Sequence, residues 1–600
     1  MPVARSDYHP MSASASGHFS KEEIQRQIEK ISASEMFVNS ARMKRFLNFV
    51  VEYSLDGRSD ELKEYLIGVE VFDRSGFDPR LDPIVRVEAR RLREKLKRYY
   101  ETIGADDELV IEFPKGSYAP QFRSRGPSPK PESFTASEPQ SDSIAVLPFR
   151  NLAPESDNEY FSDGLTEELI YLLTRVPGLR VVAWNSAAQL KNQQRDLGWI
   201  REQLGVDTIL CGSVRRSGEQ LRITAQMIDT RDGHYLWSEV YERRLHDIFA
   251  IEEEIARAIV NTLQANLWRE HLPRVTRSKE GNLDSHNLYL LGRFHLNRRT
   301  PEGLNKSVEC FERAIALDPA NAHAHAGLAD TYCLMGDYGV RSPADCVPLT
   351  RAAAGRALEL DPMLAEAYAA LASIRSLHDW EWADGERLYR KSIDLNPGYA
   401  TAHQWFGIDY LALRGRMAEA LEEIETAHRL DPLSAIVLEG RGYLSLLNRE
   451  FERAIYWYQQ VLELDPFFCN VFASLGRALS LLGRFDEAIE MFQKALSFGG
   501  RVPNMIAALG QTYALSGLEA EARRSLAELE DLARRRYISS TCFAVVHVGL
   551  GEYELALGWL ERGAERRDLP LARLHIHPVY DDIRSQPRFQ ALLRRMGFPP

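Results

Sequence analysis

The chain has 600 residues, more than one hydrophobic core usually serves, so several domains are expected. Its formal net charge of −12 argues against a protein that coats nucleic acid through a general positive charge, but it allows a local basic site. The six cysteines form no CxxC pair, which argues against a disulfide framework or a zinc finger and favours a reducing compartment.

The N-terminal segment contains no targeting signal that we can identify. It lacks the apolar stretch of a secretory signal, and nowhere does a run of about 18 apolar residues predict a membrane-spanning helix. We therefore expect a cytoplasmic protein without membrane contact. Residues 1–18 are rich in Ser and Ala and are predicted to be disordered.

A first domain is predicted at residues 19–122. Apolar residues at helical spacing predict a helix at Lys21–Ile31, an amphipathic helix within residues 40–57 and a shorter helix within residues 60–72. A loop at residues 73–82 then leads to a basic helix at Pro83–Tyr100, with Asp82 as its N-cap and Pro83 in its first turn. Residues 109–122 are predicted to form a two-stranded hairpin that turns at Pro114, Lys115 and Gly116.

The basic helix has two stripes when its residues are placed 100° apart. The apolar stripe contains Val85, Ala89, Leu92, Leu96 and Tyr99. The basic stripe beside it contains Arg86, Arg90, Arg93 and Lys97, and a further flank carries Arg91, Lys95 and Arg98. An isolated helix of this kind is more often a solvated surface helix that packs through its apolar stripe, and that alternative stays open.

The order of helix, helix, loop, basic helix and hairpin resembles the OmpR-type winged helix-turn-helix of CadC-like and HilA-like regulators. "RRLREKL" at Arg90–Leu96 is similar to the end of the third helix in that family, and Gly116 and Tyr118 are similar to its wing. The resemblance covers residues 40–122. Where the family begins with a small β-sheet, this sequence predicts a helix, and the loop before the basic helix also differs, which indicates a variant branch.

The resemblance implies that the basic helix enters the major groove of double-stranded DNA, which is about 12 Å wide. The predicted DNA-binding residues are Arg86, Arg90, Arg91, Arg93, Lys97 and Arg98 on the helix and Lys115 in the wing. By their place on the stripe, Arg86, Arg90 and Arg93 are assigned to bases, and Lys97, Arg98 and Lys115 to phosphates.

Residues 123–142 are rich in Pro and Ser and are predicted to be a flexible linker to a second domain at residues 143–267. "SIAVLPF", "LRVVAWN" and "DTILCGSV" predict strands, Ser162 or Asp163 is the predicted N-cap of a helix, and Asp232-Gly233 predicts a β-hairpin. This mixture predicts a small α/β domain. It resembles the TolB-like amino-terminal domain, which implies an interaction or sensing domain without established catalysis.

Residues 285–565 are repetitive. The prolines of the "LDP" and "LNP" motifs lie 43, 35, 35 and 34 residues apart, close to the period of a two-helix repeat. Two units hold the same types of residue at the same offsets, namely Gly442, Ala454, Tyr458 and Val461, and Gly476, Ala488, Phe492 and Ala495. The pattern resembles the tetratricopeptide repeat, which implies a superhelix with a groove for a protein or peptide. "DYGVRSPADC" is interpreted as an insertion between helices, and residues 566–600 as polar capping helices.

No catalytic, cofactor or metal site is predicted. The sequence has no Walker motif and no GxGxxG after a strand, and His323 and His325 point to different faces of a helix. "HIHP" at residues 575–578 is interpreted in the same way, and no nucleophile, base and orienting group can be placed together. We therefore expect a protein that is not an enzyme, although TolB-like domains also accompany adenylate cyclases, which keeps a cyclase-linked enzyme open.

The sequence thus predicts a multidomain α+β protein with an N-terminal winged helix, a central small α/β domain and a C-terminal α-solenoid. The predicted function is that of a DNA-binding transcription regulator whose TolB-like and tetratricopeptide domains bind a partner or signal. The alternative is a non-enzymatic scaffold whose winged helix docks protein, and the repeat array could also serve only to space or dimerise the chain. No oligomeric state is predicted.

Overall fold

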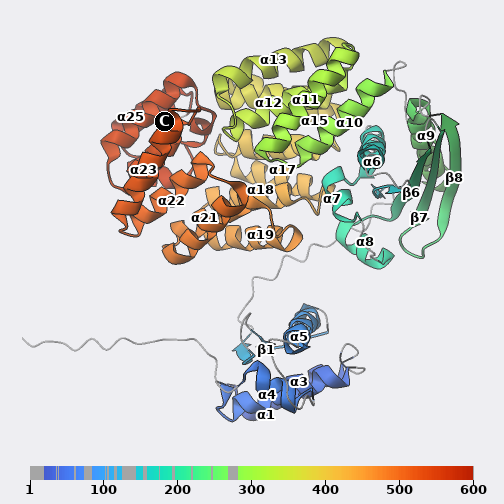
Figure 1. The fold of residues 1–600 in the computed structure, drawn as a ribbon, viewed down its shortest axis with the longest axis vertical. Coiled ribbons are helices and arrows are strands. Elements are labelled where there is room, and N and C mark those ends of the chain that lie inside the picture. The colour runs from blue at the N-terminus through green and yellow to red at the C-terminus, as the bar shows by residue number, and fades with distance from the viewer. Residues whose placement is uncertain are drawn as a thin grey trace, which may run out of the picture. The chain divides into compact units, whose positions relative to one another are not determined.

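The structure is a computed structural model that describes residues 19–34, 37, 40–59, 62–72, 84–101, 103–104, 107–113, 118–124, 143–152, 159–174, 176, 178–191, 196–217, 220–244, 248–267 and 282–598. The predicted disordered segment, most of the linker, the loop at 73–82 and the hairpin turn lie outside these residues. The chain divides into two compact units, residues 1–136 and 137–600, and each is described by itself (Figure 1). No helix in the described ranges is long and apolar enough to cross a membrane.

The first unit contains four predicted helices followed by a hairpin. They are α1 (Lys21–Ala33), α3 (Ala41–Leu55), α4 (Glu64–Glu70), α5 (Ile84–Glu101), β1 (Leu109–Glu112) and β2 (Gln121–Ser124). A capping box starts α1, because the Ser20 side chain accepts from the Glu23 N–H and Glu23 reaches back to the backbone of Ser20. The two strands pair antiparallel, with Ile111 opposite Phe122.

The core of this unit forms around α5. All five residues of its predicted apolar stripe are at most 3% exposed, and they pack with Phe46 and Val50 of α3 and Ile111 of β1. The Asp107 carboxylate, also buried, accepts hydrogen bonds from Gln27 and Lys30 of α1 and from Tyr99 of α5. Burial by itself raises the pKa of Asp107, but these hydrogen bonds lower it below its usual value. The carboxylate therefore ties both helices to the start of the hairpin.

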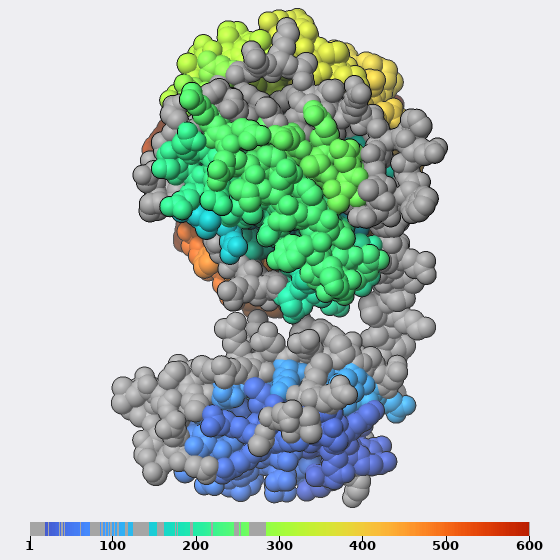
Figure 2. Space-filling model, turned by 90° about the vertical axis from the view of Figure 1, so that its right-hand side faces the viewer, coloured from blue at the N-terminus to red at the C-terminus, as the bar shows by residue number. Residues whose placement is uncertain are grey.

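The second unit begins with a six-stranded sheet. Its strands are β3 (Ser143–Val146), β4 (Arg150–Asn151), β5 (Arg180–Val181), β6 (Thr208–Ser217), β7 (Gln220–Asp229) and β8 (Tyr235–Arg244). The order is β5-β3-β6-β7-β8, with β4 paired to β6. Strand β3 runs parallel to β5 and β6, whereas β6, β7 and β8 are antiparallel. The predicted hairpin lies between β7 and β8, and most side chains of the edge strand β8 are exposed (Figure 2).

Helices cover both faces of the parallel part of this sheet. They are α6 (Glu159–Thr174), α7 (Trp184–Gln189), α8 (Leu197–Leu204) and α9 (Ile248–Leu267). Because side chains alternate along a strand, Ile144 and Val146 of β3 pack with α6 and α9, whereas Ala145 packs with Ile200 of α8. The sheet thus has two hydrophobic layers at its parallel end.

One prediction in this region was wrong, and a second was confirmed only in part. Helix α6 begins at Glu159, so Ser162 and Asp163 lie inside it and do not cap it. The Phe161 side chain is 1% exposed, and its burial in the core extends the helix toward its N-terminus. The strand expected at "LRVVAWN" is limited to Arg180–Val181, because Trp184 already starts α7.

Residues 282–598, all of them described, form eight helix pairs and a C-terminal segment. The first helices of the pairs are α10 (Leu283–Asn297), α12 (Ala322–Asp337), α14 (Ala365–Ile374), α16 (Ala400–Phe406), α18 (Ala435–Leu447), α20 (Cys469–Leu481), α22 (Pro503–Leu515) and α24 (Ser540–Gly549). The second helices are α11 (Pro301–Leu317), α13 (Pro343–Leu360), α15 (Trp382–Leu395), α17 (Met417–Leu430), α19 (Phe451–Leu464), α21 (Phe485–Gly499), α23 (Glu519–Ala533) and α25 (Tyr553–Arg566). The π-helical turns η4 (Arg375–Asp379) and η5 (Gly407–Leu411) extend α14 and α16.

The predicted small and aromatic positions explain how the two helices of a pair approach each other. A Cβ atom on Gly442 of α18 would lie 2.4 Å from Cε1 of Tyr458 in α19, so only glycine fits opposite the ring. Gly476 and Phe492 are in similar contact in the next pair. The predicted insertion is smaller than expected, because only residues 338–342 separate α12 from α13. Half of the extra length of that unit lies in α13, which has 18 residues against 14 in α15, and most of the rest lies in this linker, which is longer than residues 380–381 between η4 and α15.

The C-terminal segment, residues 567–598, differs from the predicted polar cap. It comprises η6 (Leu569–Arg573), η7 (Pro578–Ile583) and α26 (Pro587–Arg595). Its apolar side chains, among them Leu574, Phe589 and Met596, are buried in the same cluster as residues of the earlier repeats. The segment is therefore part of the core of the array.

Candidate nucleic-acid interface and the closed repeat array

Helix α5 carries six of the seven predicted DNA-binding residues. Its backbone places positions 86, 90, 93 and 97 along one face, next to the buried apolar stripe. The side chains of Arg86, Arg90, Arg91, Lys97 and Arg98 lie outside the described residues, and so does Lys115. The assignments of these six residues stay predictions.

Arg93 is engaged within the first unit. Its side chain is half-buried, and Nε donates to the carbonyl oxygen of Phe113 at 3.0 Å, just after β1. Its neighbour on the other flank, Lys95, donates to the hydroxyl of Ser40 and lies over the ring of Phe37, 5.1 Å from its centroid. Both residues thus anchor α5, a role that the charge pattern did not predict. The sequence signal that could have predicted this anchoring role is that both residues lie next to the apolar stripe of α5.

The hairpin is attached to the helices by two tyrosines. Tyr118 is the predicted aromatic residue of the wing, and its hydroxyl donates to Oε1 of Glu64 in α4 at 2.8 Å. The Tyr100 hydroxyl accepts from the Ile111 N–H at 2.9 Å. Together with Arg93 and Asp107, these bonds fix the hairpin beside α5.

The sheet domain and the repeat array form one packed body through α6 and α10. Arg293 of α10 donates to Oε1 of Glu167 from Nε at 2.9 Å and from Nη2 at 2.7 Å. Gly164 of α6 permits close approach, because a Cβ atom there would lie 2.4 Å from Cδ1 of Leu290. Asp330, 4% exposed, lies 4.0 Å from the Arg293 guanidinium. Burial raises the pKa of Asp330 to about 7 despite that positive charge.

A second contact between these parts uses a repeat motif. The carboxylate of Asp431, in the "LDP" turn after α17, accepts from the Ser186 N–H and the Asn185 side chain of α7, each at 2.8 Å, and from the Ser186 hydroxyl. The Ala183 N–H donates to the Leu430 carbonyl at 2.8 Å. By contrast, Asp465 in the next "LDP" turn accepts only locally, from the Phe467 N–H at 3.0 Å. Nothing in the motif itself distinguishes the two aspartates.

The C-terminal segment lies across helices of several earlier repeats. Arg573 binds Asp337 at the end of α12 at 2.8 Å and Asp409 in η5 at 2.9 Å. The Trp382 indole donates to the Met596 carbonyl at 2.9 Å, and Nη1 of Arg567 donates to the Asp379 carbonyl at 2.7 Å. Burial raises the pKa of Asp409 to about 6 even beside Arg573. Much of the inner surface expected to hold a peptide is thus covered by the chain itself.

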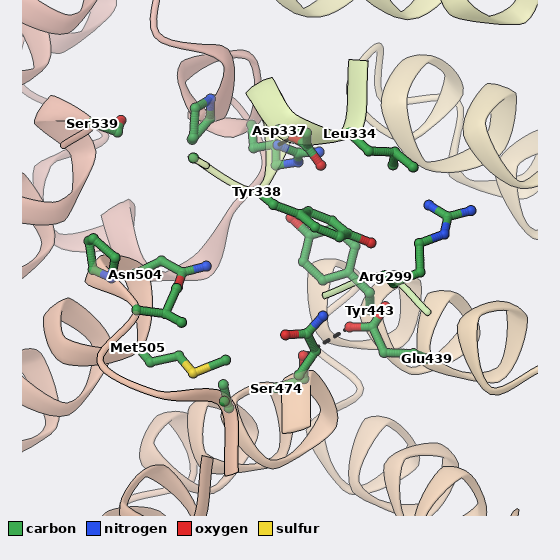
Figure 3. A pocket seen from close by; sticks show the side chains of 18 of the residues that line it. Arg299, Leu334, Asp337, Tyr338, Glu439, Tyr443, Ser474, Asn504, Met505 and Ser539 are labelled. Carbon is green, nitrogen blue, oxygen red and sulfur yellow. Dashed lines mark hydrogen bonds and ion pairs between the residues drawn. The ribbon is translucent and has the colours of Figure 1, made fainter. Parts of the chain in front are cut away.

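The space that remains inside the array is a cavity of about 720 Å³. Its walls come mainly from the turn after α10, from α12, α14, α16 with η5, α18, α20, α22 and α24, and from the C-terminal segment. Arg299, Tyr338, Tyr443 and Glu439 lie on one side, and Asn504 and Met505 lie on the opposite side (Figure 3). The Ser474 hydroxyl donates to Oε1 of Glu439 at 2.9 Å.

The histidines singled out in the sequence make ordinary packing and hydrogen-bond contacts. His323 packs edge-on against Tyr171 with ring centroids 5.1 Å apart, and His325 bonds the Pro319 carbonyl at 3.2 Å. His575 stacks on Phe598 at 5.0 Å, and His577 lies 3.3 Å from Nη1 of Arg477. Within the described part of the chain, no three His, Cys, Asp or Glu side chains are grouped as metal ligands.

Comparison with known families supports two of the predicted regions. The family described as HilA/YgeH-like transcriptional regulator, second domain, matches residues 140–258. Tetratricopeptide repeat families match residues 406–467 and 470–498, which confirms the predicted repeats. The similarity of residues 143–267 to TolB-like domains and of residues 40–122 to OmpR-type domains stays a prediction.

Similar proteins cover only part of the chain. The transcriptional regulator HilA of Salmonella typhimurium is 25% identical over 308 residues, 50% of this chain and 53% of that protein. Putative adenylate cyclase 3 of Rhizobium meliloti is 36% identical over 215 residues, 36% of each chain. The structure of the human IFIT1 dimer with PPP-AAAA is 17% identical, covers 58% of this chain and 78% of that one, and has a TM-score of 0.37. The chain thus spans between about a third and about half of the curated relatives it matches, and it is similar to a HilA/YgeH-like second domain joined to tetratricopeptide repeats.

Proposed function

We propose that the protein is a DNA-binding transcription regulator whose first unit is a variant OmpR-type winged helix-turn-helix. In this proposal α5 enters the major groove, and the hairpin β1–β2 is the wing. One observation carries it: the buried apolar stripe fixes one side of α5 in the core, so the adjacent basic positions lie next to that stripe on a helix held in place by the hairpin. A helix presented in this way fits the major groove.

The similarity of residues 140–258 to the second domain of HilA/YgeH-like regulators supports this assignment. We propose that this domain, TolB-like in its sequence, and the repeat array act together as the part that responds to a protein partner or a signal. Their joint packing through Glu167 and Asp431 supports a common response, because a change in the array would move the sheet domain with it. We further propose that the chain has no catalytic activity of its own, which a test for ATP turnover by the purified protein would check.

The DNA-binding proposal is tested by gel-shift titration on genomic fragments with the Arg86→Ala/Arg90→Ala double variant. Each lost base contact is expected to weaken specific binding by about 1–3 kcal/mol. The matched control is Lys21→Ala/Arg26→Ala, which removes the same charge from α1. Since specificity comes from base contacts and not from net charge, the control should keep its preference for the bound fragments.

Two outcomes would count against the proposal. If the wild type shifts no fragment even at low salt, where phosphate contacts are strongest, the first unit docks protein and the scaffold alternative holds. If both double variants lose affinity equally, the charge of the unit attracts DNA without α5 reading it.

A further inference from the structure

The first helix of each repeat unit ends in a turn that passes through a residue with positive φ. These residues are Arg299, Gly339, Trp380, Gly415, Arg449, Gly483, Gly517 and Gly551. Glycine adopts this conformation without strain, whereas a residue with a Cβ atom does not. Strained positions of this kind persist where the surrounding structure holds them, so the contacts of the three exceptions to glycine are informative.

Two of the three exceptions hold the C-terminal segment. Arg449 binds Asp581, with Nη2 and Oδ1 2.8 Å apart. The ring of Trp380 lies under the guanidinium of Arg567, 4.3 Å from its centroid. Arg299 differs from both, because it lines the cavity and has no carboxylate within 4 Å among the residues that the structure describes.

The cavity wall carries two more arginines, Arg573 and Arg477, and only Arg573 is paired with carboxylates of the described residues. Arg573 is neutralised by Asp337 and Asp409. Arg477 instead donates Nη1 to Nε2 of His577 at 3.3 Å. Burial, together with the positive charge of Arg477 and Arg573, holds the pKa of His577 well below its usual value, so its imidazole is neutral and offsets no charge.

Two buried acids lie near these arginines, Asp330 near Arg299 and Glu439 near Arg477, and both are weakened as counter-charges because burial raises their pKa. Glu439 already accepts from the Ser474 hydroxyl, and burial raises its pKa, which favours its uncharged form. Two guanidinium groups, those of Arg299 and Arg477, thus border the cavity without an ion pair. Arginine pairs with carboxylates and phosphates through parallel N–H donors, so the two guanidinium groups suit an anionic partner.

The size and walls of the cavity define the rest of that partner. The larger part of the wall is apolar, with the side chains of Tyr338, Tyr443, Trp405, Phe468 and Met505 on it. Cavities of about 300–1,000 Å³ accommodate small molecules. At about 720 Å³, this one is too small for a folded partner.

We propose that the cavity binds a small organic carboxylate with an apolar or aromatic body, with its carboxylate on Arg299 and Arg477 as the second cation (Figure 3). The site does not depend on DNA binding by the first unit. A molecule bound there contacts the turn after α10 at one end of the array and the C-terminal segment at the other. Its binding therefore stabilises the closed array by mass action.

Hydrocinnamate, an aromatic acid, and its amide test the proposal in calorimetric titrations of the full chain. The acid should bind about tenfold or more tightly than the amide, because only the acid offers a charged partner for arginine. Arg299→Gly should remove this preference without lowering the unfolding temperature, since glycine suits the turn. Arg523→Ala, which removes an exposed arginine bound to Glu519 and Glu552 outside the cavity wall, should keep it.

Two further variants show whether Arg299→Gly loses the preference for the acid through the lost cation or through a change in the structure of the turn. Arg299→Lys keeps a cation and should retain the preference in part, whereas Arg299→Gln keeps the strain of the turn and should lose it. The proposal is overturned if the wild type binds neither compound, if acid and amide bind equally, or if Arg299→Gly retains the preference of the wild type. Each of these results leaves the gel-shift outcome untouched.

Discussion

Basic residues are used in two different ways in the two units. In the first unit, seven Lys and Arg residues gather on one helix with only two glutamates among them. In the repeat array, Arg293 and Arg573 are each enclosed with carboxylates of other helices, and Arg441 lies over Trp457 while it binds Glu425. Our proposal assigns the excess of positive charge on α5 to contact with another molecule, whereas the arginines of the array are engaged with carboxylates of the chain itself. Arg93 and Lys95 show that the first use also includes anchoring residues.

Among the buried ion pairs of the array, we expect the substitution of Arg573 to lower the stability most. Arg573→Met leaves Asp337 and Asp409 buried without their shared cation, and losing one partner of a buried ion pair costs about 3–5 kcal/mol of the free energy of unfolding. Denaturation by urea, followed by tryptophan fluorescence, measures the loss. Arg588→Ala removes an arginine bound to Glu554 and Glu561 on the surface, and should leave the midpoint unchanged. Equal effects of the two variants would show that burial of the ion pair does not matter.

The pH dependence of stability tests the protonation of a second buried acid of the array, Asp330. Because its folded pKa of about 7 lies above the ordinary value of 3.8, the folded state holds a proton that the unfolded state releases between these values. The contribution of Asp330 to stability is thus present at low pH and is lost as the pH rises to about 7. Asp330→Asn should flatten this dependence and raise the stability at pH 8 by up to about 4 kcal/mol, since one pKa unit corresponds to about 1.4 kcal/mol.

The measurement for Asp330 is urea denaturation of wild type and variant at intervals between about pH 4 and pH 8, which spans its ordinary pKa of 3.8 and its folded pKa of about 7. Asp361→Asn is the control, since that carboxylate only accepts from the Met363 N–H of its own turn at 2.9 Å. A constant difference between Asp330→Asn and wild type across this range would mean that Asp330 stays ionised in the folded protein.

We expect the smallest effect on stability for Asp431, in the "LDP" turn that contacts α7. Asp431→Ala leaves Ser186 and Asn185 without their buried acceptor, which costs about 1–3 kcal/mol and loosens α7 from the array. Hydrogen exchange of residues 184–189 should become faster. Asp465→Ala, in the same motif, removes only a local hydrogen bond and should leave that segment protected. If both variants leave exchange unchanged, α7 is held by its apolar contacts alone.

Local patterns were enough to predict much of the molecule. The periodicity of α5, the hairpin at Asp232-Gly233 and the complementarity of Gly442 and Tyr458 all depend on residues close in sequence or at a repeated offset. The contact of Asp431 with Ser186 and the closure by Arg573 depend on pairs separated by 245 and 164 residues or more. A periodic sequence pattern does not reveal contacts between residues so far apart in the chain. The start of α6 was missed because burial of Phe161 outweighed the capping preference of Ser162 and Asp163.

The contacts of Arg573 also bear on how the protein is made. A stack of repeats can normally fold as each unit leaves the ribosome, since every unit needs only its neighbours. Here Asp337 in the second helix pair and Asp409 in the fourth bind an arginine that is synthesised much later, so these pairs complete their contacts only near the end of translation. A chain truncated before residue 567 would therefore be defective in its second to fourth helix pairs as well as at its C-terminal end.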